Sequence, residues 1–287
     1  MNRILSATLG TGPLPARIAN GLAIIGLVWF AYYFATAGAH AGDAHAYWAA
    51  DVAHPYTTDV NQTDAFLYSP AFLLVMIPFQ GLPFSAFFAI FTVVNIAVLA
   101  WMVGPVLALL VLLPGEFSPL WINLWYGNII ILMAAVIVAG FRWPGAWSFM
   151  LLTKVTPGVG ALWFVGRRDW KALIQIGVVT AVAILVSFVL GPHLWPEWFA
   201  HLQRSAAEPD VFSIIPPLEW RLLAALILAL GGGVLRLRWT VVIAAMLAQP
   251  VFWFSGLAML VALLGLVRHR RAILRHEHQT DVDPAAA

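Results

Sequence analysis

Apolar residues run along this chain in long blocks and do not alternate with polar ones. Such blocks exceed the usual length of a strand and approach the ~20 residues with which a helix crosses a bilayer, whereas barrel strands would alternate. We therefore predict an all-α fold, a polytopic bundle of transmembrane helices with about ten hydrophobic segments. The expected segments are residues 18–37, two within 70–103, then 103–113, 129–140, 144–165, 172–190, 218–234, and two within 239–267.

Two of these regions contain breaks. Residues 78–83 read PFQGLP, and a Gln-Pro pair interrupts the last region at 249–250. Proline removes a helical hydrogen bond, so each break predicts a hinge. Several segments are also too short to span a bilayer, and we expect these to be tilted or re-entrant inside the bundle. The alternative for the first segment is a signal peptide, but its apolar run is too long for one.

Charged residues predict the orientation. Residues 38–69 carry aspartates and no Lys or Arg, and residues 191–217 form a second polar loop. Lys and Arg favour the cytoplasmic side of a membrane. They gather before the first helix, at 167–171, at 236–238 and in the tail, so both polar loops are expected to meet over the outer end of the bundle. We expect one transmembrane domain over residues 1–267 and a basic, frayed cytoplasmic tail over 268–287.

Composition supports a membrane protein. The chain has 287 residues, of which 62% are hydrophobic and 10% are charged, against about 25% charged residues in soluble domains. Without cysteine there is no disulfide, thiolate metal site or thiol nucleophile. The basic pI of about 9.2 is explained by arginines that set the topology, so no nucleic-acid partner is inferred.

One lysine interrupts an otherwise apolar run. Lys154 lies in SFMLLTKVTPGVGALWF, and a charge at the bilayer centre costs about 2.5–3.5 kcal/mol on insertion scales. Such a residue is paired with an acid, reaches toward the interface, or has a function. Pro157 and the glycines after it are expected to weaken the helix just beyond the lysine.

An acidic residue just beyond the first helix is the second candidate. Asp43 could act as a general base on a hydroxyl, bind a cation, or cap the following helix. His45, Asp51 and His54 lack the tight helical spacing of a zinc site, so no metal site is inferred.

The order of several motifs resembles the polyprenol-phosphate-dependent mannosyltransferases of glycosyltransferase family 87, bacterial membrane enzymes of the GT-C fold. The similarity extends from about residue 42 to 264. The motifs that carry it are GDAHAY, HPY, FLYSPAF, PFQGLP, FSPLWINLWYGNIIIL, PGAWSFMLLTKVTPGVGALWFVGRRDWKAL and AQPVFWFSGLAML.

The resemblance implies an enzyme that transfers a sugar, mannose, from a polyprenyl-phosphate donor. The acceptor would be a hydroxyl of a glycolipid or cell-envelope glycan at the outer face of the bacterial plasma membrane. It implies that Asp43 is the catalytic base and that Lys154 holds the donor phosphate, with no metal or other cofactor required. Arg142 and Arg221, placed near the outer ends of helices, are further phosphate candidates, or plain interfacial anchors.

Aromatic and amide residues complete the expected site. Sugar and acceptor contacts are expected from tyrosines and histidines of the outer loops and from the amide of Asn128, where belt aromatics and solvated histidines are the alternative explanation for the loop residues. Asn128 stands where the family pattern has glutamine. The expected residues are Tyr47, Tyr56, Tyr68, Asn128, His193 and His201.

Two other functions fit the same features. A transporter or flippase of a lipid-linked anion would also need Lys154 and broken helices. An inactive GT-C-like assembly subunit would keep the fold without the chemistry.

Overall fold

The computed structural model describes residues 14–37, 42–59, 62–206 and 215–282, and within these ranges every regular element is a helix. This confirms the predicted all-helical fold. In chain order the helices are α2 (Leu14–Ala37), α3 (Gly42–Ala49), α4 (Pro70–Gln80), α5 (Phe84–Val103), α6 (Pro105–Leu112), η1 (Gly115–Phe117), α7 (Pro119–Tyr126), α8 (Ile130–Gly140), η2 (Pro144–Ala146), α9 (Trp147–Thr153), η3 (Thr156–Ala161), α10 (Leu162–Arg167), α11 (Trp170–Leu190), α12 (Leu194–Ala206), α13 (Leu218–Val234), α14 (Trp239–Leu247), η4 (Phe254–Leu260) and α15 (Val261–Val282).

Three helices in the described part of the chain are long and apolar enough to cross a membrane. They are α2, α5 and α11, and a fourth span results if α7 and α8, which meet at an angle of 115°, count as one broken helix. Apolar side chains of α2 and α11 are largely exposed, as expected for helices that face lipid. Helix α15 has 22 residues but is less apolar, and the remaining described helices are shorter, in agreement with the prediction that several segments are too short to span a bilayer.

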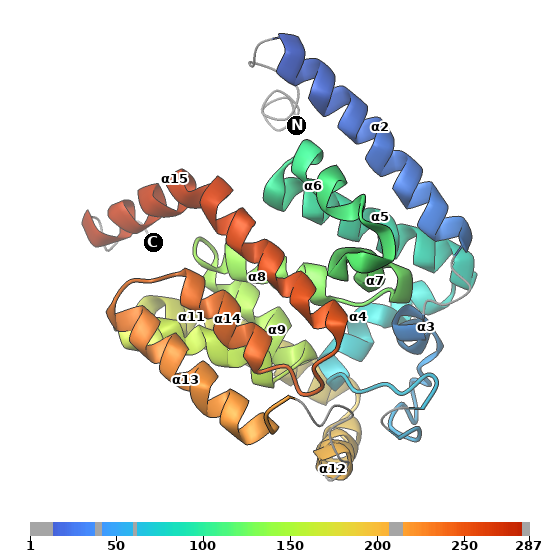
Figure 1. The fold of residues 1–287 in the computed structure, drawn as a ribbon. Helices are drawn as coiled ribbons and strands as arrows, with labels where there is room; N and C mark the ends of the chain where they lie inside the picture. Colours follow the sequence, from blue (N-terminus) through green and yellow to red (C-terminus); the bar gives the residue numbers. More distant parts are fainter. Residues whose placement is uncertain (1–13, 38–41, 60–61, 207–214, 283–287) are drawn as a thin grey trace.

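The helices surround α8 (Figure 1). This helix is apolar throughout, and α5, α9, α15 and η4 pack against it. On one side α2 runs along α5 and α6, while α13 and α14 pack together on the other. The amphipathic helix α12 lies at one end of the bundle, where Trp198 donates a hydrogen bond from its ring nitrogen to the Leu67 carbonyl at 3.2 Å. The two polar loops therefore meet at the same end of the bundle, as predicted.

The predicted breaks are present, with two differences. Helices α4 and α5 are hinged at Gly81–Pro83, and the chain is irregular after α14 near Pro250. The segment expected as one helix over residues 144–165 is instead divided into η2, α9, η3 and α10. The tail expected to be frayed continues α15 as helix to Val282, and residues 283–287 lie outside the described part.

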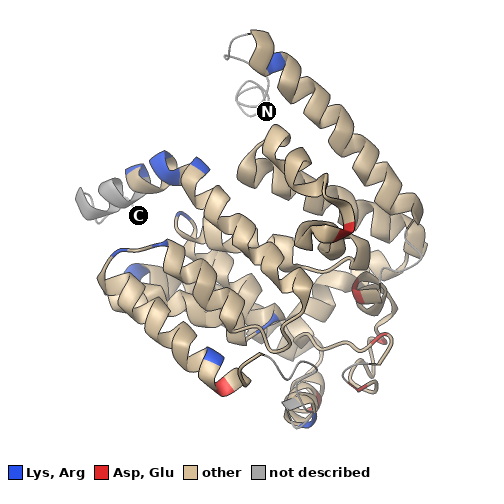
Figure 2. Cartoon of the chain, viewed as in Figure 1, with Lys and Arg blue, Asp and Glu red and all other residues tan. Residues whose placement is uncertain are grey.

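Basic side chains gather at the end of the bundle opposite α12 (Figure 2). Lys and Arg lie along the middle of α15, at the connection from α13 to α14 and at the start of α2, whereas most acidic residues lie toward the other end. The Arg238 guanidinium lies over the Phe141 ring, and the charges of Arg268 and Arg142 both act on His269. Basic segments far apart in the sequence thus share one end, as the charge pattern predicts.

Glycines allow α10 and α13 to approach closely. A β-carbon on Gly233 would overlap the Trp163 carbonyl oxygen, and one on Gly166 would overlap the Leu230 carbonyl oxygen. Small residues at helix contacts bring backbones together in membranes, where the hydrophobic effect does not drive helices to associate.

We predict that Gly233→Ala destabilises the protein by about 1–3 kcal/mol, because the added methyl group overlaps backbone that cannot move freely. Thermal unfolding of the purified protein in detergent measures the loss. The control is Gly231→Ala on the same helix, where a β-carbon meets nothing within 4 Å; this change should be neutral or stabilising because alanine favours helix. Equal unfolding midpoints for the two variants would contradict the packing argument.

Candidate functional site

The chain breaks after α9, at Lys154. Helix α9 ends at Thr153, and Lys154 has an extended backbone with φ −127° and ψ 98° before η3 begins with Pro157 in its first turn. Because proline lacks an N–H, the helix cannot continue smoothly through this region. The lysine thus lies at an interruption inside the bundle, partly buried, and not on a continuous helix face.

The first polar loop is held against this break. Ser69 donates a hydrogen bond from its hydroxyl to the Leu152 carbonyl at 2.5 Å, and its backbone N–H donates to the same oxygen at 3.4 Å. Two residues of separate segments are thereby fixed beside Lys154. Serine at this position was not among the predicted site residues; the small polar residue before the helix-starting Pro70 was the available signal.

Asp43 is positioned by its short helix and by the turn between α7 and α8. It lies in the first turn of α3, and its Oδ2 accepts a hydrogen bond from the Asn128 side-chain nitrogen at 2.6 Å. The Asn123 side chain in turn donates to the Asn128 carbonyl at 3.0 Å. Gly127, with φ of +66°, allows this turn to touch Ala44. The predicted amide at 128 thus contacts the predicted acid.

Asp43 and Lys154 act on each other electrostatically. Burial raises the pKa of the Asp43 carboxyl above its usual range, while the Lys154 charge and the hydrogen bond from Asn128 oppose that rise. No ion pair or hydrogen bond joins the two side chains in the part of the chain that the structure describes. The acid and the cation are therefore close enough to influence each other, but they do not neutralise each other by direct contact.

Two tyrosines complete this group. The hydroxyls of Tyr47 and Tyr68 are hydrogen-bonded at 2.9 Å, and both side chains are buried. The Asp43 charge acts on both phenols. We call Asp43, Tyr47, Tyr68, Asn128 and Lys154 the Asp43–Lys154 cluster; all five were predicted from sequence.

Three other predicted residues lie outside this cluster, where the first polar loop meets the second. Tyr56 donates from its hydroxyl to the Tyr68 carbonyl at 2.9 Å and packs against the His201 ring, with ring centres 5.7 Å apart. His201 is buried and not solvated, and burial followed by the Arg204 charge lowers its pKa, so it is neutral at pH 7. His193 is exposed, with its Nε2 3.4 Å from the Ala53 carbonyl.

The two predicted arginines do not join the Asp43–Lys154 cluster. Arg142 lies beyond α8 with its guanidinium 4.8 Å from the centre of the Trp143 ring, and it acts on His269 at the basic end of the bundle. The expectation that Arg142 lies at the outer end was therefore wrong. The C-terminal end of α8 lies near the basic segments, and the chain turns back at η2 just after it.

Arg221 is used structurally. Its guanidinium is buried and donates hydrogen bonds to backbone carbonyls at 2.6–3.2 Å. The acceptors are Pro216, Leu247, Gln249 and Pro250. The break after α14 leaves backbone carbonyls without helical hydrogen-bond donors, and Arg221 donates hydrogen bonds to them. This side chain therefore stabilises the break and is not placed to bind the donor phosphate.

The described chain combines membrane-length apolar helices with a buried acid–cation cluster, which defines it as a helical membrane protein with a polar site at one end. The sequence model of glycosyltransferase family 87 matches residues 66–283. The chain belongs to this family and is a membrane glycosyltransferase by family. Lys154 and Asn128 lie inside the matched range, whereas Asp43 precedes it. Comparison with curated proteins and with solved structures found no match.

We predict that Gly127→Ala destabilises the protein more than Gly115→Ala does. Both glycines have φ near +60°, so each alanine pays about 1 kcal/mol for the left-handed backbone. Only at Gly127 would the β-carbon also overlap Ala44, whereas Gly115 has open space. Thermal unfolding of both purified variants measures the difference, and equal losses would show that the turn does not need this close contact to hold α3.

Proposed function

We propose that the protein transfers a sugar, mannose, from a polyprenyl-phosphate donor to a hydroxyl of a glycolipid or cell-envelope glycan on the outer face of the membrane. The observation that supports this proposal is that Asp43 and Lys154 act on each other electrostatically without forming a direct ion pair among the described residues. A transfer of this kind needs a base for the incoming hydroxyl and a cation for the departing phosphate, and the Asp43–Lys154 cluster supplies one of each.

Asp43 is the base in this scheme. Its Oδ2 is held by Asn128, which leaves Oδ1 to accept the proton of the acceptor hydroxyl as that oxygen attacks the anomeric carbon. Because burial raises its pKa, this carboxylate is a stronger base than an exposed aspartate. A single displacement would invert the configuration at the anomeric carbon.

Lys154 is the cation for the leaving group. As the bond between the anomeric carbon and the phosphate oxygen breaks, charge develops on the lipid phosphate, and the ammonium forms a charge-assisted hydrogen bond to it. The extended backbone at residue 154 gives the side chain access from within the bundle, so the phosphate need not be reached from a continuous helix face.

The orientation completes the proposal. Helix α3, which carries Asp43, lies nearer to α12 than to the basic end of the bundle (Figure 1), and Lys and Arg favour the cytoplasmic side. The site would then face away from the cytoplasm of the bacterial cell. A lysine in a broken helix would also fit a transporter of a lipid-linked anion, and the adjacent Asp43–Asn128 pair favours transfer, because transport needs no base.

We predict that Asp43→Asn lowers the rate of mannose transfer from polyprenyl-phosphate mannose by at least about 10²-fold. Asparagine keeps the shape and can still accept the hydrogen bond from Asn128, but it cannot take a proton. The control is Asp51→Asn, at an exposed loop position, which should transfer at the wild-type rate. Transfer by Asp43→Asn close to wild type would remove Asp43 as the base, and absence of transfer by the wild type would favour a transporter or an assembly subunit.

We predict that Lys154→Met weakens binding of polyprenyl phosphate by about 10- to 100-fold, because a hydrogen bond to a charged group contributes about 1.5–3 kcal/mol. Binding is measured by titration of the lipid phosphate into protein in nanodiscs. Lys171→Met, at the start of α11 near the basic end, serves as the matched control and should bind normally. An unchanged affinity in Lys154→Met would show that this lysine does not hold the phosphate.

A further inference from the structure

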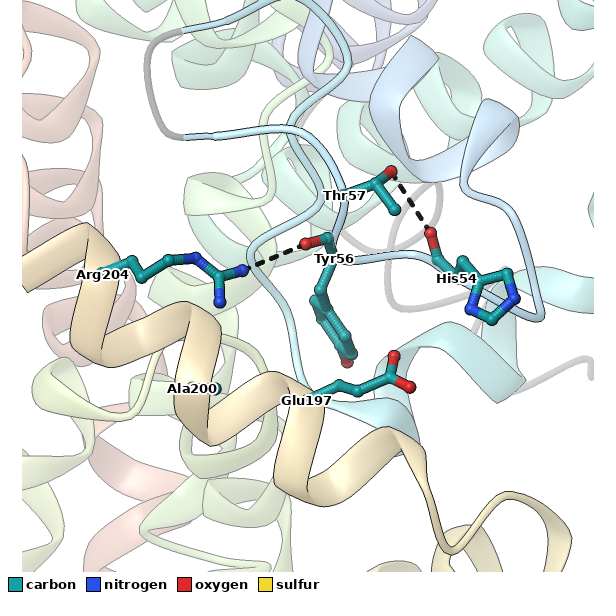
Figure 3. A pocket seen from close by; sticks show the side chains of 6 residues that line it. All are labelled: His54, Tyr56, Thr57, Glu197, Ala200 and Arg204. Atoms are coloured by element: carbon teal, nitrogen blue, oxygen red, sulfur yellow. Dashed lines mark hydrogen bonds between the residues drawn. The ribbon is translucent and has the colours of Figure 1, made fainter.

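A polar pocket lies between the first outer loop and α12 (Figure 3). Its volume is about 280 Å³, close to the lower end of the range for small-ligand sites. A carboxylate, a guanidinium, an imidazole and a phenol ring are all present in it. The lining residues are His54, Tyr56, Thr57, Glu197, Ala200 and Arg204.

The walls of this pocket are fixed by hydrogen bonds between segments far apart in the sequence. Arg204 donates from NH2 to the Tyr56 carbonyl at 3.3 Å, and the Tyr56 hydroxyl donates to the Tyr68 carbonyl at 2.9 Å. Trp198, on the buried face of α12, donates to the Leu67 carbonyl. The pocket is thus built by the tertiary fold and is more than a gap between two mobile loops.

Polar groups remain available inside it. In Figure 3 the Glu197 side chain extends toward the space between Tyr56 and His54, and its carboxylate makes no hydrogen bond or ion pair within the described residues. Arg204 lies on the other side of Tyr56. An acceptor and a donor therefore flank an aromatic ring.

This arrangement restricts the class of ligand. A phosphate would be repelled by Glu197, and an apolar ligand would leave charged groups without water or partners. A single carboxylate is a poor site for a metal ion, which needs several oxygen ligands. A neutral sugar presents several hydroxyls, each able to donate and accept, and these match the carboxylate, guanidinium and imidazole of the lining.

We propose that this pocket binds a sugar unit of the acceptor, apart from the sugar that is transferred. The proposal rests on the proposed function, and Tyr68 links the two sites: its carbonyl holds Tyr56 in the pocket, and its hydroxyl contacts Tyr47 in the Asp43–Lys154 cluster. A glycan held in the pocket would keep its reacting hydroxyl near Asp43, and the pocket would select acceptors that already carry a sugar.

The test is sugar binding to the purified protein in lipid nanodiscs, which avoids sugar-based detergents. Saturation-transfer NMR with methyl α-mannoside, methyl α-glucoside and methyl β-galactoside reports binding without any reaction. At least one of these probes should bind the wild type. Glu197→Gln should weaken that binding by about tenfold or more, because it removes a charged acceptor of hydroxyl hydrogen bonds.

A second pair of variants tests the pocket by shape. Ala200→Leu fills it from an exposed helical position that tolerates leucine and should abolish binding. Gln203→Leu, exposed on the same helix and outside the pocket, is the matched control and should bind as the wild type does. Wild-type binding by both Glu197→Gln and Ala200→Leu, or no binding of any probe to the wild type, would overturn the proposal.

Failure of this proposal and failure of the proposed function give different results. If the pocket is right, Asp43→Asn still binds the sugar probe, because Asp43 does not line the pocket. If the wild-type protein transfers no sugar but its binding of the probe depends on Glu197, the pocket proposal is supported and the proposed transferase function is rejected. Loss of binding in Asp43→Asn equal to that in Glu197→Gln would place the probe at the Asp43–Lys154 cluster and reject the separate pocket.

Discussion

The structure depends on one electrostatic constraint: a lysine inside an apolar bundle must be compensated. Lys154 and Asp43 act on each other electrostatically, and no direct ion pair joins them among the described residues. Direct contact would neutralise both groups and leave nothing for a substrate, whereas wide separation would leave a buried charge that costs several kcal/mol. In the proposed function, a third, anionic group such as the donor phosphate would complete this arrangement.

Several irregular features of the fold position the segments that carry Asp43 and Lys154. The chain breaks at Lys154, the Ser69 hydroxyl holds the end of α9 through the Leu152 carbonyl, and Gly127 lets the turn after α7 reach α3. Backbone groups left unpaired at such breaks must be satisfied inside the bundle. Arg221 does this at the break after α14, where its guanidinium donates to several carbonyls. Arg221, which the sequence suggested as a phosphate ligand, thus stabilises the fold instead.

The two outer loops have different tasks in this picture. The first carries Asp43 and both tyrosines of the Asp43–Lys154 cluster, and the second folds into α12, which covers the first through Trp198 and His201. The proposed sugar pocket lies between them, with Glu197 and Arg204 from α12. Chemistry and acceptor selection would therefore reside on separate segments joined at Tyr68.

The sequence by itself determined the helical class, most helix positions, the hinge between α4 and α5, and the clustering of basic residues at one end, because long apolar runs, proline and arginine act locally or through the membrane. It also predicted roles for Asp43, Asn128 and Lys154, and the structure places Asn128 against Asp43, which Lys154 influences electrostatically. Only the tertiary structure decided that Arg142 turns toward the basic end, that Arg221 binds backbone carbonyls, and that Glu197 and Arg204 share a pocket. Those outcomes depend on how broken helices bend and pack, and residue spacing along one chain does not specify that geometry.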